Sequence, residues 1–234
     1  MSYVTTIQRA VDAFYRLAVG AIVEVATDEP LVALTFDDGP HPDYTPRVLE
    51  ILARYDARAT FFMVGRAAAG QPAVVRRVLE AGHAIANHSW DHTSFAAIDG
   101  RQRRRQLKAC QRVLGRAAEK LFRPPYGDQI VASRLDAGLL GFRVVGWSLD
   151  VDDWLVDDPA ALASGLTEGV RPGSIVLLHD AIYRSEANQA LVFRREPMLE
   201  ALADFLDAVR GRYRFVSLPD LLRAGRPVVQ EWYG

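Results

Sequence analysis

Strand-like and helical segments alternate along this chain, and this alternation limits its possible folds more than any other feature. Seven short apolar segments have the pattern of strands, at roughly 31 to 37, 58 to 65, 83 to 88, 120 to 123, 142 to 149, 174 to 179 and 213 to 217. A helical segment follows each of them, at 45 to 55, 71 to 82, 99 to 118, 129 to 140, 159 to 169, 196 to 210 and 218 to 224. Strands that are apolar on both faces and alternate with helices form a parallel sheet covered by helices. The sequence therefore predicts an α/β fold, a distorted (β/α)7 barrel with one place unfilled.

The length of the chain, 234 residues, suits a single domain of this kind. We assign residues 31–234 to that domain and residues 1–30 to an N-terminal amphipathic helix and lead-in. Apolar residues three and four positions apart support the helix: Val4, Ile7, Val11, Phe14 and Ala18. We expect this helix to pack on the barrel, with contact to a membrane surface or a partner as the alternative.

Charge and targeting signals restrict the partners and the location. The formal net charge is -1, so the chain lacks the overall basic field that attracts nucleic acid. Arg9, Asp12 and Arg16 do not fit a secretory signal, and Glu24 interrupts an apolar stretch that is too short to span a bilayer. A cytoplasmic location is favoured, with an extracellular or periplasmic one as the alternative. No feature of the sequence specifies an oligomeric state.

Other polar residues of the predicted elements have ordinary structural interpretations. Asp99, Asp128 and Asp158 precede helical segments and are expected to cap them. The basic run 101 to 108 is expected to be a solvated helix face, with docking to an acidic partner as the alternative. His83, at the start of a strand-like segment, is expected to be structural.

Titratable residues follow the ends of the predicted strands. They are Asp37 and Asp38 after the first, His88 and His92 after the third, Arg123 and Tyr126 after the fourth, Asp150 and Asp153 after the fifth, and His179 at the sixth. Because the carboxyl ends of parallel strands open on one face of a barrel, we expect all of them to share one rim.

Each motif also has an ordinary interpretation when it is considered alone. An Asp-Asp-Gly sequence is commonly a turn or a helix cap, and two histidines four apart commonly lie on a solvated helix face. Together, one carboxylate and two imidazoles form a standard ligand set for Zn²⁺ or a similar divalent ion. Only one of two adjacent aspartates can easily ligate the same ion, which leaves the other free to act as a base.

Six motifs follow one another along the chain: TFDDGP (35 to 40), ATFFMVG (59 to 65), NHSWDH (87 to 92), RPPYG (123 to 127), DVDDW (150 to 154) and LLHD (177 to 180). In this order they resemble the motifs of the polysaccharide deacetylase family, also called the NodB homology domain or carbohydrate esterase family 4. The resemblance covers about residues 31 to 222. It implies the distorted barrel of that family and hydrolysis of acetyl groups on sugars.

The resemblance also implies a role for each matching residue. Asp38, His88 and His92 would bind one divalent metal ion, most favourably Zn²⁺, with Co²⁺ or Mn²⁺ as alternatives. Asp37 would be the general base paired with Arg123, and His179 the general acid oriented by Asp153. The backbone N–H of Tyr126 would stabilise the oxyanion. Leu177 would line the acetyl pocket and Trp154 would stack on a sugar, with core packing as the alternative for each.

Two regions outside the motifs border the expected groove. His41 and Tyr44 follow the first motif and are either groove or plain loop residues. The segment 181 to 196 is long and polar, and loops on this face of a barrel set specificity. We therefore predict that Tyr183, Arg184, Arg194 and Arg195 select the substrate, with the arginines contacting an anionic group or remaining solvated.

The expected reaction is removal of N-acetyl groups from N-acetylhexosamine units of an oligo- or polysaccharide. An O-acetyl esterase acting on a glycan, or an amidase acting on a non-sugar substrate, would use the same site and remains an alternative. A catalytically dead carbohydrate-binding module would have lost the base, the ligands or the acid, and all of these residues are present.

Overall fold

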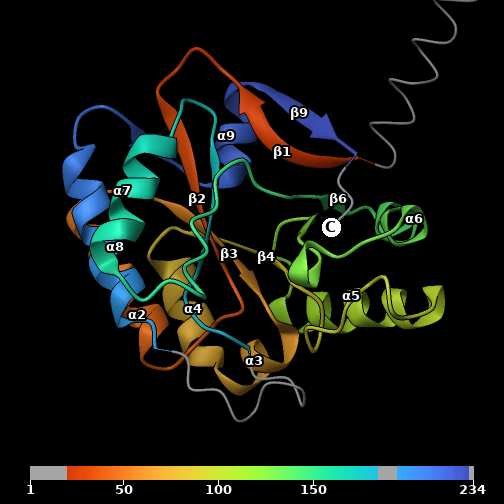
Figure 1. The fold of residues 1–234 in the computed structure, drawn as a ribbon. Helices are drawn as coiled ribbons and strands as arrows, with labels where there is room; N and C mark the ends of the chain where they lie inside the picture. Colours follow the sequence, from red (N-terminus) through yellow and green to blue (C-terminus); the bar gives the residue numbers. More distant parts are fainter. Residues whose placement is uncertain (1–19, 184–193, 232–234) are drawn as a thin grey trace, which may run out of the picture.

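The computed structural model of the protein describes residues 20–183 and 194–231, and its centre is a parallel sheet of seven strands (Figure 1). The strands lie in the order β6-β5-β4-β3-β2-β7, and β8 also pairs with β2. Their bounds are β2 (Leu31–Asp37), β3 (Ala59–Met63), β4 (Ala84–Asn87), β5 (Leu121–Phe122), β6 (Arg143–Val144), β7 (Ile175–His179) and β8 (Arg214–Phe215). Every pairing among these strands is parallel, as in the predicted barrel.

The sheet curls so that the segment after β6 approaches β7. The backbone N–H of Ser148 donates to Ile175 O at 2.9 Å, and the N–H of Leu177 donates to Leu149 O at 2.9 Å. The predicted strand 142 to 149 is therefore wrong in its extent, because only Arg143–Val144 form the strand β6. The rest of the segment bends away from β5 to close the barrel against β7.

Helices cover the outside of the sheet. Their bounds are α2 (Tyr44–Arg54), α3 (Gly65–Gly70), α4 (Pro72–Glu80), α5 (Gly100–Leu114), α6 (Val131–Leu139), α7 (Pro159–Gly169), α8 (Glu196–Ala208) and α9 (Leu218–Ala224), with a 3₁₀ turn η1 at Pro125–Gly127. In Figure 1, α2, α7 and α8 lie together on the left, and α5 and α6 on the right. The distorted barrel and its single domain are confirmed.

Capping follows the sequence at two of the three expected positions. Asp99 accepts a hydrogen bond from Gln102 N–H at 2.8 Å and completes a capping box at the start of α5. Asp158 accepts from the first N–H groups of α7. Asp128 is not a cap, because α6 begins after Ile130; the Asp128 carboxylate instead accepts from the hydroxyl of Ser94.

The basic run on α5 is only partly a solvated face. Arg103 is buried, and its Nε donates to Asp136 Oδ2 on α6 at 2.7 Å. Arg104 also pairs with Asp136. The alternation of charge along a helix does not reveal such pairs, because the acidic partner comes from the neighbouring helix α6. His83 is structural: its Nδ1 accepts from Ala59 N–H at 3.1 Å, and burial and Arg58 lower its pKa to about 4.

The strands β1 (Ala21–Ala26) and β9 (Arg226–Gln230) form a separate antiparallel pair. Residues 21–26 belong to the segment assigned to the N-terminal lead-in, yet Ile22 and Val25 are buried in the core. The pairing joins two distant parts of the chain, so local periodicity does not reveal it. The helix expected around Val4 to Ala18 lies outside the described residues.

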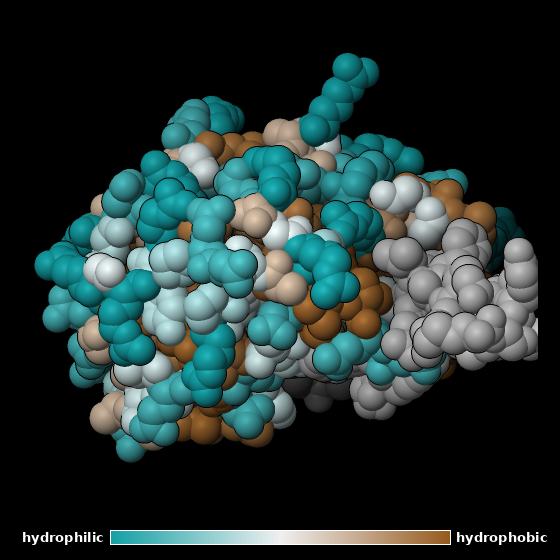
Figure 2. Space-filling view, turned by 90° about the horizontal axis from the view of Figure 1, so that it is seen from above, coloured by the Kyte–Doolittle hydropathy of each residue, from teal (hydrophilic) through white to brown (hydrophobic). Residues whose placement is uncertain are grey.

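The surface at the β1–β9 end is mainly polar. Figure 2 shows hydrophilic residues over most of the coloured surface, with apolar residues in separate small areas. Isolated apolar residues of this kind are ordinary on a globular protein. Within residues 20–183 and 194–231, no helix combines the length and the apolar character needed to cross a bilayer.

Candidate active site

The first two carboxylates of the site come from the end of β2. Asp37 is the last residue of the strand, and Asp38 has a left-handed backbone with φ 77°. Both side chains are buried. Gly39 follows, and a Cβ atom at that position would collide with the carboxylate of Asp180, so only glycine fits the turn. The sequence TFDDGP thus places two adjacent carboxylates in one buried site.

Left-handed backbone conformations concentrate around this site. Among the described residues, six non-glycine residues have a positive φ, and five of these belong to the segments that build the site: Asp38, Ser89, His92, Tyr126 and Asp152. Such conformations cost free energy and persist where the surrounding contacts require them. Local periodicity does not predict them, since each depends on packing between segments.

Asp38, His88 and His92 form a set that could hold a metal ion. One ligand atom from each lies within 4.8 Å of the others, and all three residues are buried. Asp38 Oδ1 lies 3.3 Å from His88 Nε2 and 3.1 Å from His92 Nε2. Burial alone would raise the pKa of Asp38, but the two histidines hold it well below its usual value.

The contacts behind these side chains fit a cation at this position. His88 Nδ1 lies 2.8 Å from the carbonyl oxygen of Arg123, which can only accept, so this nitrogen carries the proton and Nε2 has a free lone pair. The backbone N–H of Tyr183 donates to Asp38 Oδ2 at 2.9 Å, while Asp38 Oδ1 is buried without a hydrogen bond among the described residues. Oxygen and nitrogen lone pairs therefore converge where a divalent ion would bind.

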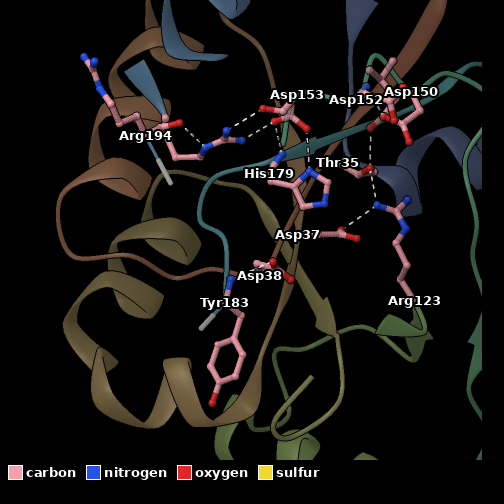
Figure 3. A network of polar contacts seen from close by, with 12 residues as sticks. Thr35, Asp37, Asp38, Arg123, Asp150, Asp152, Asp153, His179, Tyr183 and Arg194 are labelled. Atoms are coloured by element: carbon pink, nitrogen blue, oxygen red, sulfur yellow. Dashed lines mark hydrogen bonds and ion pairs between the residues drawn. The ribbon is translucent and has the colours of Figure 1, made fainter. Parts of the chain in front are cut away.

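Asp37 is held by a buried arginine on the other side of the site. Arg123 Nη1 donates to Asp37 Oδ1 and to Thr35 Oγ1, both at 2.8 Å, and Nη2 donates to Gly146 O at 2.8 Å. Burial lowers the pKa of Arg123, and Asp37 opposes that effect. Figure 3 shows this arginine reaching Asp37 from the strand end β5. The arrangement fixes a carboxylate, paired with a buried cation, next to the possible metal site.

His179 and Asp153 form a second pair across the site. His179 Nδ1 lies 2.7 Å from Asp153 Oδ1, and the backbone N–H of His179 donates to Asp153 Oδ2 at 3.0 Å. Burial lowers the pKa of His179, but Asp153, Asp38 and Asp37 together raise it to about 9. The imidazole is therefore protonated at neutral pH and can donate a proton.

A cavity of about 590 Å³ connects these groups to solvent. Its walls carry the residues expected there, namely Tyr126, Trp154 and Leu177, and others that the motifs did not single out: Trp147, Asp152, Leu155 and Ile182. Leu177 is buried, whereas Trp154 and Tyr126 are 45% and 62% exposed. Tyr126 lies edge-on to His92 with ring centroids 4.4 Å apart. Exposed rings at the rim and a buried leucine below are typical of a pocket for an organic ligand.

Asp150 lies at the shared rim, as expected: it lines the cavity, and its pKa is raised, mainly by burial. His41 and Tyr44 do not line the cavity. His41 Nδ1 accepts from nearby backbone N–H groups, and Tyr44 OH donates to Glu196 of α8 at 3.2 Å. His41 lies in the loop before α2 and Tyr44 is the first residue of α2, so neither is a groove residue.

The prediction that Arg195 selects the substrate is wrong. This residue is buried, and its Nη1 donates to Asp153 Oδ2 at 3.0 Å. Arg194 has a 72% exposed side chain, lies 3.7 Å from Glu196 and is not among the residues that line the described cavity, so its expected role in substrate selection is not supported. Arg184 lies outside the described residues. Tyr183 does line the cavity. No local pattern separates Arg195 from Arg194, because burial depends on the distant segment that contains Asp153.

A barrel whose rim carries an Asp-His-His set between two acid–base pairs is characteristic of metal-dependent hydrolases. The family model described as polysaccharide deacetylase matches residues 24–145, and the chain belongs to this family.

Known proteins similar to this chain include two curated deacetylases. The chitooligosaccharide deacetylase of Sinorhizobium fredii is 36% identical over 201 residues, covering 82% of this chain and 92% of the relative. A peptidoglycan-N-acetylglucosamine deacetylase of Bacillus cereus is 34% identical over 208 residues, covering 86% and 92%. The solved structure of the Bc1960 peptidoglycan N-acetylglucosamine deacetylase superposes with a TM-score of 0.78 at 28% identity, covering 88% of this chain and 94% of that one.

Proposed function

We propose that this protein is a metal-dependent hydrolase that removes N-acetyl groups from N-acetylhexosamine units of an oligo- or polysaccharide and releases acetate. One observation carries the proposal. Asp37, paired with Arg123, and His179, paired with Asp153, line one cavity together with the Asp38–His88–His92 set. Two relatives that match this chain over most of their length are named as chitooligosaccharide and peptidoglycan N-acetylglucosamine deacetylases, which supports the substrate class.

Asp38, His88 and His92 would hold one divalent cation. Two imidazole nitrogens and one carboxylate oxygen favour Zn²⁺, and Co²⁺ or Mn²⁺ would also fit such a set. When bound, the cation supplies Lewis-acid chemistry, since it polarises a carbonyl oxygen and makes a nearby water molecule more acidic. Arg123 O and Tyr183 N–H orient two of the three ligands.

Asp37 would act as the general base. It takes a proton from the water whose oxygen attacks the acetamide carbonyl carbon, and the hydrogen bond from Arg123 fixes its carboxylate in place. The backbone N–H of Tyr126 would donate to the oxyanion that develops on the carbonyl oxygen. The left-handed turn at Tyr126, with φ 61°, supports a specific orientation for this peptide group.

His179 would then act as the general acid. The bond between the carbonyl carbon and nitrogen breaks, and His179 protonates the departing amine while acetate forms. Asp153 holds the imidazole through Nδ1, which leaves Nε2 as the nitrogen that donates. An amine is a poor leaving group without this proton, so the raised pKa of His179 suits the task.

The cavity would position the sugar as well as the acetyl group. Leu177 would contact the acetyl methyl group, and Trp154 would stack on a sugar ring at the rim. Tyr126 lies at the same rim, and its exposed ring would extend the aromatic surface on which the sugar stacks. These contacts favour acetylated sugars over flexible non-sugar amides.

Acetate release from N-acetylated chitooligosaccharides and from O-acetylated xylan tests the proposed function. We expect Zn²⁺-dependent release from the chitooligosaccharide that a chelator abolishes and added Zn²⁺ restores. Release from xylan alone would favour the O-acetyl esterase alternative, and release from neither substrate would contradict the proposal. The cytoplasmic location expected from the sequence stays a prediction, which fractionation of cells producing the native protein tests.

A further inference from the structure

A buried arginine that the family motifs do not include lies behind the acid pair. Arg195, directly before α8, donates from Nη1 to Asp153 Oδ2 at 3.0 Å and from Nη2 to Asp153 O at 2.6 Å. Its side chain is only 3% exposed, and that of Asp153 is 0% exposed. The guanidinium of Arg195 therefore donates hydrogen bonds to both the carboxylate and the backbone carbonyl of Asp153. Two bonds of this kind fix position as well as charge.

The contacts of Asp153 divide between the arginine and the histidine. Its Oδ1 faces the ring of His179, and its Oδ2 accepts from the backbone N–H of His179 and from Arg195. Rotation of the carboxylate would break the ring contact and the arginine contact together. Because a charged pair this deeply buried is costly unless its hydrogen bonds are complete, the arrangement has one favourable geometry.

We propose that Arg195 is a positioning residue for the general acid: by clamping Asp153, it fixes the orientation of the His179 ring and limits how strongly that ring retains its proton. This inference rests on the proposed function of His179 as the acid that protonates the leaving amine. Arg195 itself lies behind Asp153 and does not touch the reacting atoms. Its effect on the reaction therefore passes through His179.

The charges around His179 determine how this effect would be measured. Asp37 and Asp38 face it from β2 and the turn after it, Asp150 and Asp153 face it from the segment before α7, and Arg195 is the cation behind Asp153. Loss of Arg195 leaves the attraction of Asp153 for the imidazolium less compensated. The histidine would then hold its proton more tightly, which makes it a weaker acid.

Three variants test the proposal in the full-length protein loaded with Zn²⁺. Arg195→Met removes the charge and both bonds, Arg195→Lys keeps the charge, and Arg194→Met is the matched control, because Arg194 is the adjacent arginine and is exposed. The substrates are a chitooligosaccharide amide and an aryl acetate ester, whose good leaving group needs little protonation. We expect Arg195→Met to lower kcat on the amide about 10- to 100-fold, as outer-shell partners do, and to change the ester rate much less. Arg195→Lys should recover part of the loss, and Arg194→Met should match the wild type.

A double-mutant comparison shows whether Arg195 acts through His179. In a His179→Ala background, the additional effect of Arg195→Met on the amide should fall to less than about 3-fold, because coupled residues are not additive. Equal losses on amide and ester, or an undiminished loss in the His179→Ala background, would overturn the proposal. If Arg195→Met does not fold, the same comparisons with Arg195→Lys decide.

An NMR titration of His179 separates this inference from the proposed function. In the full-length protein with and without Zn²⁺, Arg195→Met should raise the pKa of His179 by about one pH unit, and Arg194→Met should leave it unchanged. An unchanged pKa in Arg195→Met would refute the role of Arg195. Absence of acetate release by the wild type from any acetylated glycan would instead refute the proposed function, and the titration would still report on Arg195.

Discussion

Both sides of the cavity contain a carboxylate paired with a buried arginine, but the two pairs face the cavity differently. On one side Arg123 binds Asp37, whose carboxylate lies in the cavity. On the other side Arg195 binds Asp153, and the group in the cavity is His179. The same kind of ion pair thus presents a proton acceptor to the cavity on one side and supports a proton donor on the other. The imidazole that lies between the second carboxylate and the cavity makes this side an acid instead of a base.

The two sides also differ in how they are built. Asp37 and Arg123 come from strand ends, and Arg123 is further fixed by Thr35 and by Gly146 O. Asp153 and Arg195 come from irregular segments before α7 and α8. Removing one partner of such a buried pair costs about 3–5 kcal/mol because it leaves the other charge buried and unpaired, so variants of either arginine are expected to be less stable.

We expect the largest effect when one ligand is removed from the Asp38–His88–His92 set, which lies between the two sides of the cavity. His88→Ala should abolish stoichiometric metal binding and lower activity by more than the roughly 10- to 100-fold typical of outer-shell partners. The barrel has its own core, so the variant should still fold. Metal content, acetate release and circular dichroism check this, and full activity with tightly bound metal would show that the ligand set is wrong.

We expect the second-largest effect on the rate of hydrolysis when the proposed general base, Asp37, is changed. Asp37→Asn should keep the metal but slow hydrolysis by about 10²-fold or more, the usual contribution of a positioned proton-transfer group. Water attack is common to both substrates, so amide and ester should lose rate together. Steady-state rates with metal content measured in parallel test this, and wild-type rates in Asp37→Asn would assign the base elsewhere.

The acid side should show its own pH dependence. In the metal-free protein, we expect NMR to give His179 a pKa of about 9, against an ordinary value of 6.5. Because this pKa is raised in the folded state, its stabilising contribution is complete below pH 6.5 and is lost as the pH rises through about 9. Added Zn²⁺ should lower the value, since the cation offsets the attraction of Asp37 and Asp38. A pKa at or below 6.5 in the metal-free protein would contradict the electrostatic account.

The smallest effect should come from the rim that both sides share. Trp154→Ala should raise KM for chitooligosaccharides by about 10-fold or less, corresponding to about 1.4 kcal/mol, and spare an aryl acetate. The indole is partly exposed and lines the cavity without contacting the acid–base pairs in any hydrogen bond. Equal KM changes for both substrates would contradict sugar stacking.

Local pattern predicted most of the fold and the motif residues. Helical periodicity and apolar runs identified the β–α alternation, because a strand that is buried on both faces, such as β2, has a nearly continuous apolar sequence. The β1–β9 pair was missed because its two strands lie near opposite ends of the chain, as the register of Ala21 with Gln230 shows. The helix α3 was missed because it fills the short gap between the predicted strand 58 to 65 and the predicted helix 71 to 82. It begins at Gly65, where a Cβ would meet the ring of Trp90 at 2.7 Å.

The residues missed in the site share one physical cause. Arg195 and Arg194 are adjacent and chemically identical, but only the first is buried against Asp153. Trp147 likewise reaches the cavity because the segment after β6 bends toward β7. Such placements depend on contacts between distant segments, which spacing along the chain does not encode.

The most direct test of the account is the selectivity of His179→Ala compared with Asp37→Asn. We would measure kcat/KM for both variants on a chitooligosaccharide amide and on an aryl acetate, with Zn²⁺ saturating. We expect His179→Ala to lower kcat/KM about 10²- to 10⁴-fold on the amide and far less on the ester. We expect Asp37→Asn to lower kcat/KM by a similar factor on both substrates. Equal losses on amide and ester in His179→Ala would contradict the assignment of base and acid to opposite sides of the cavity.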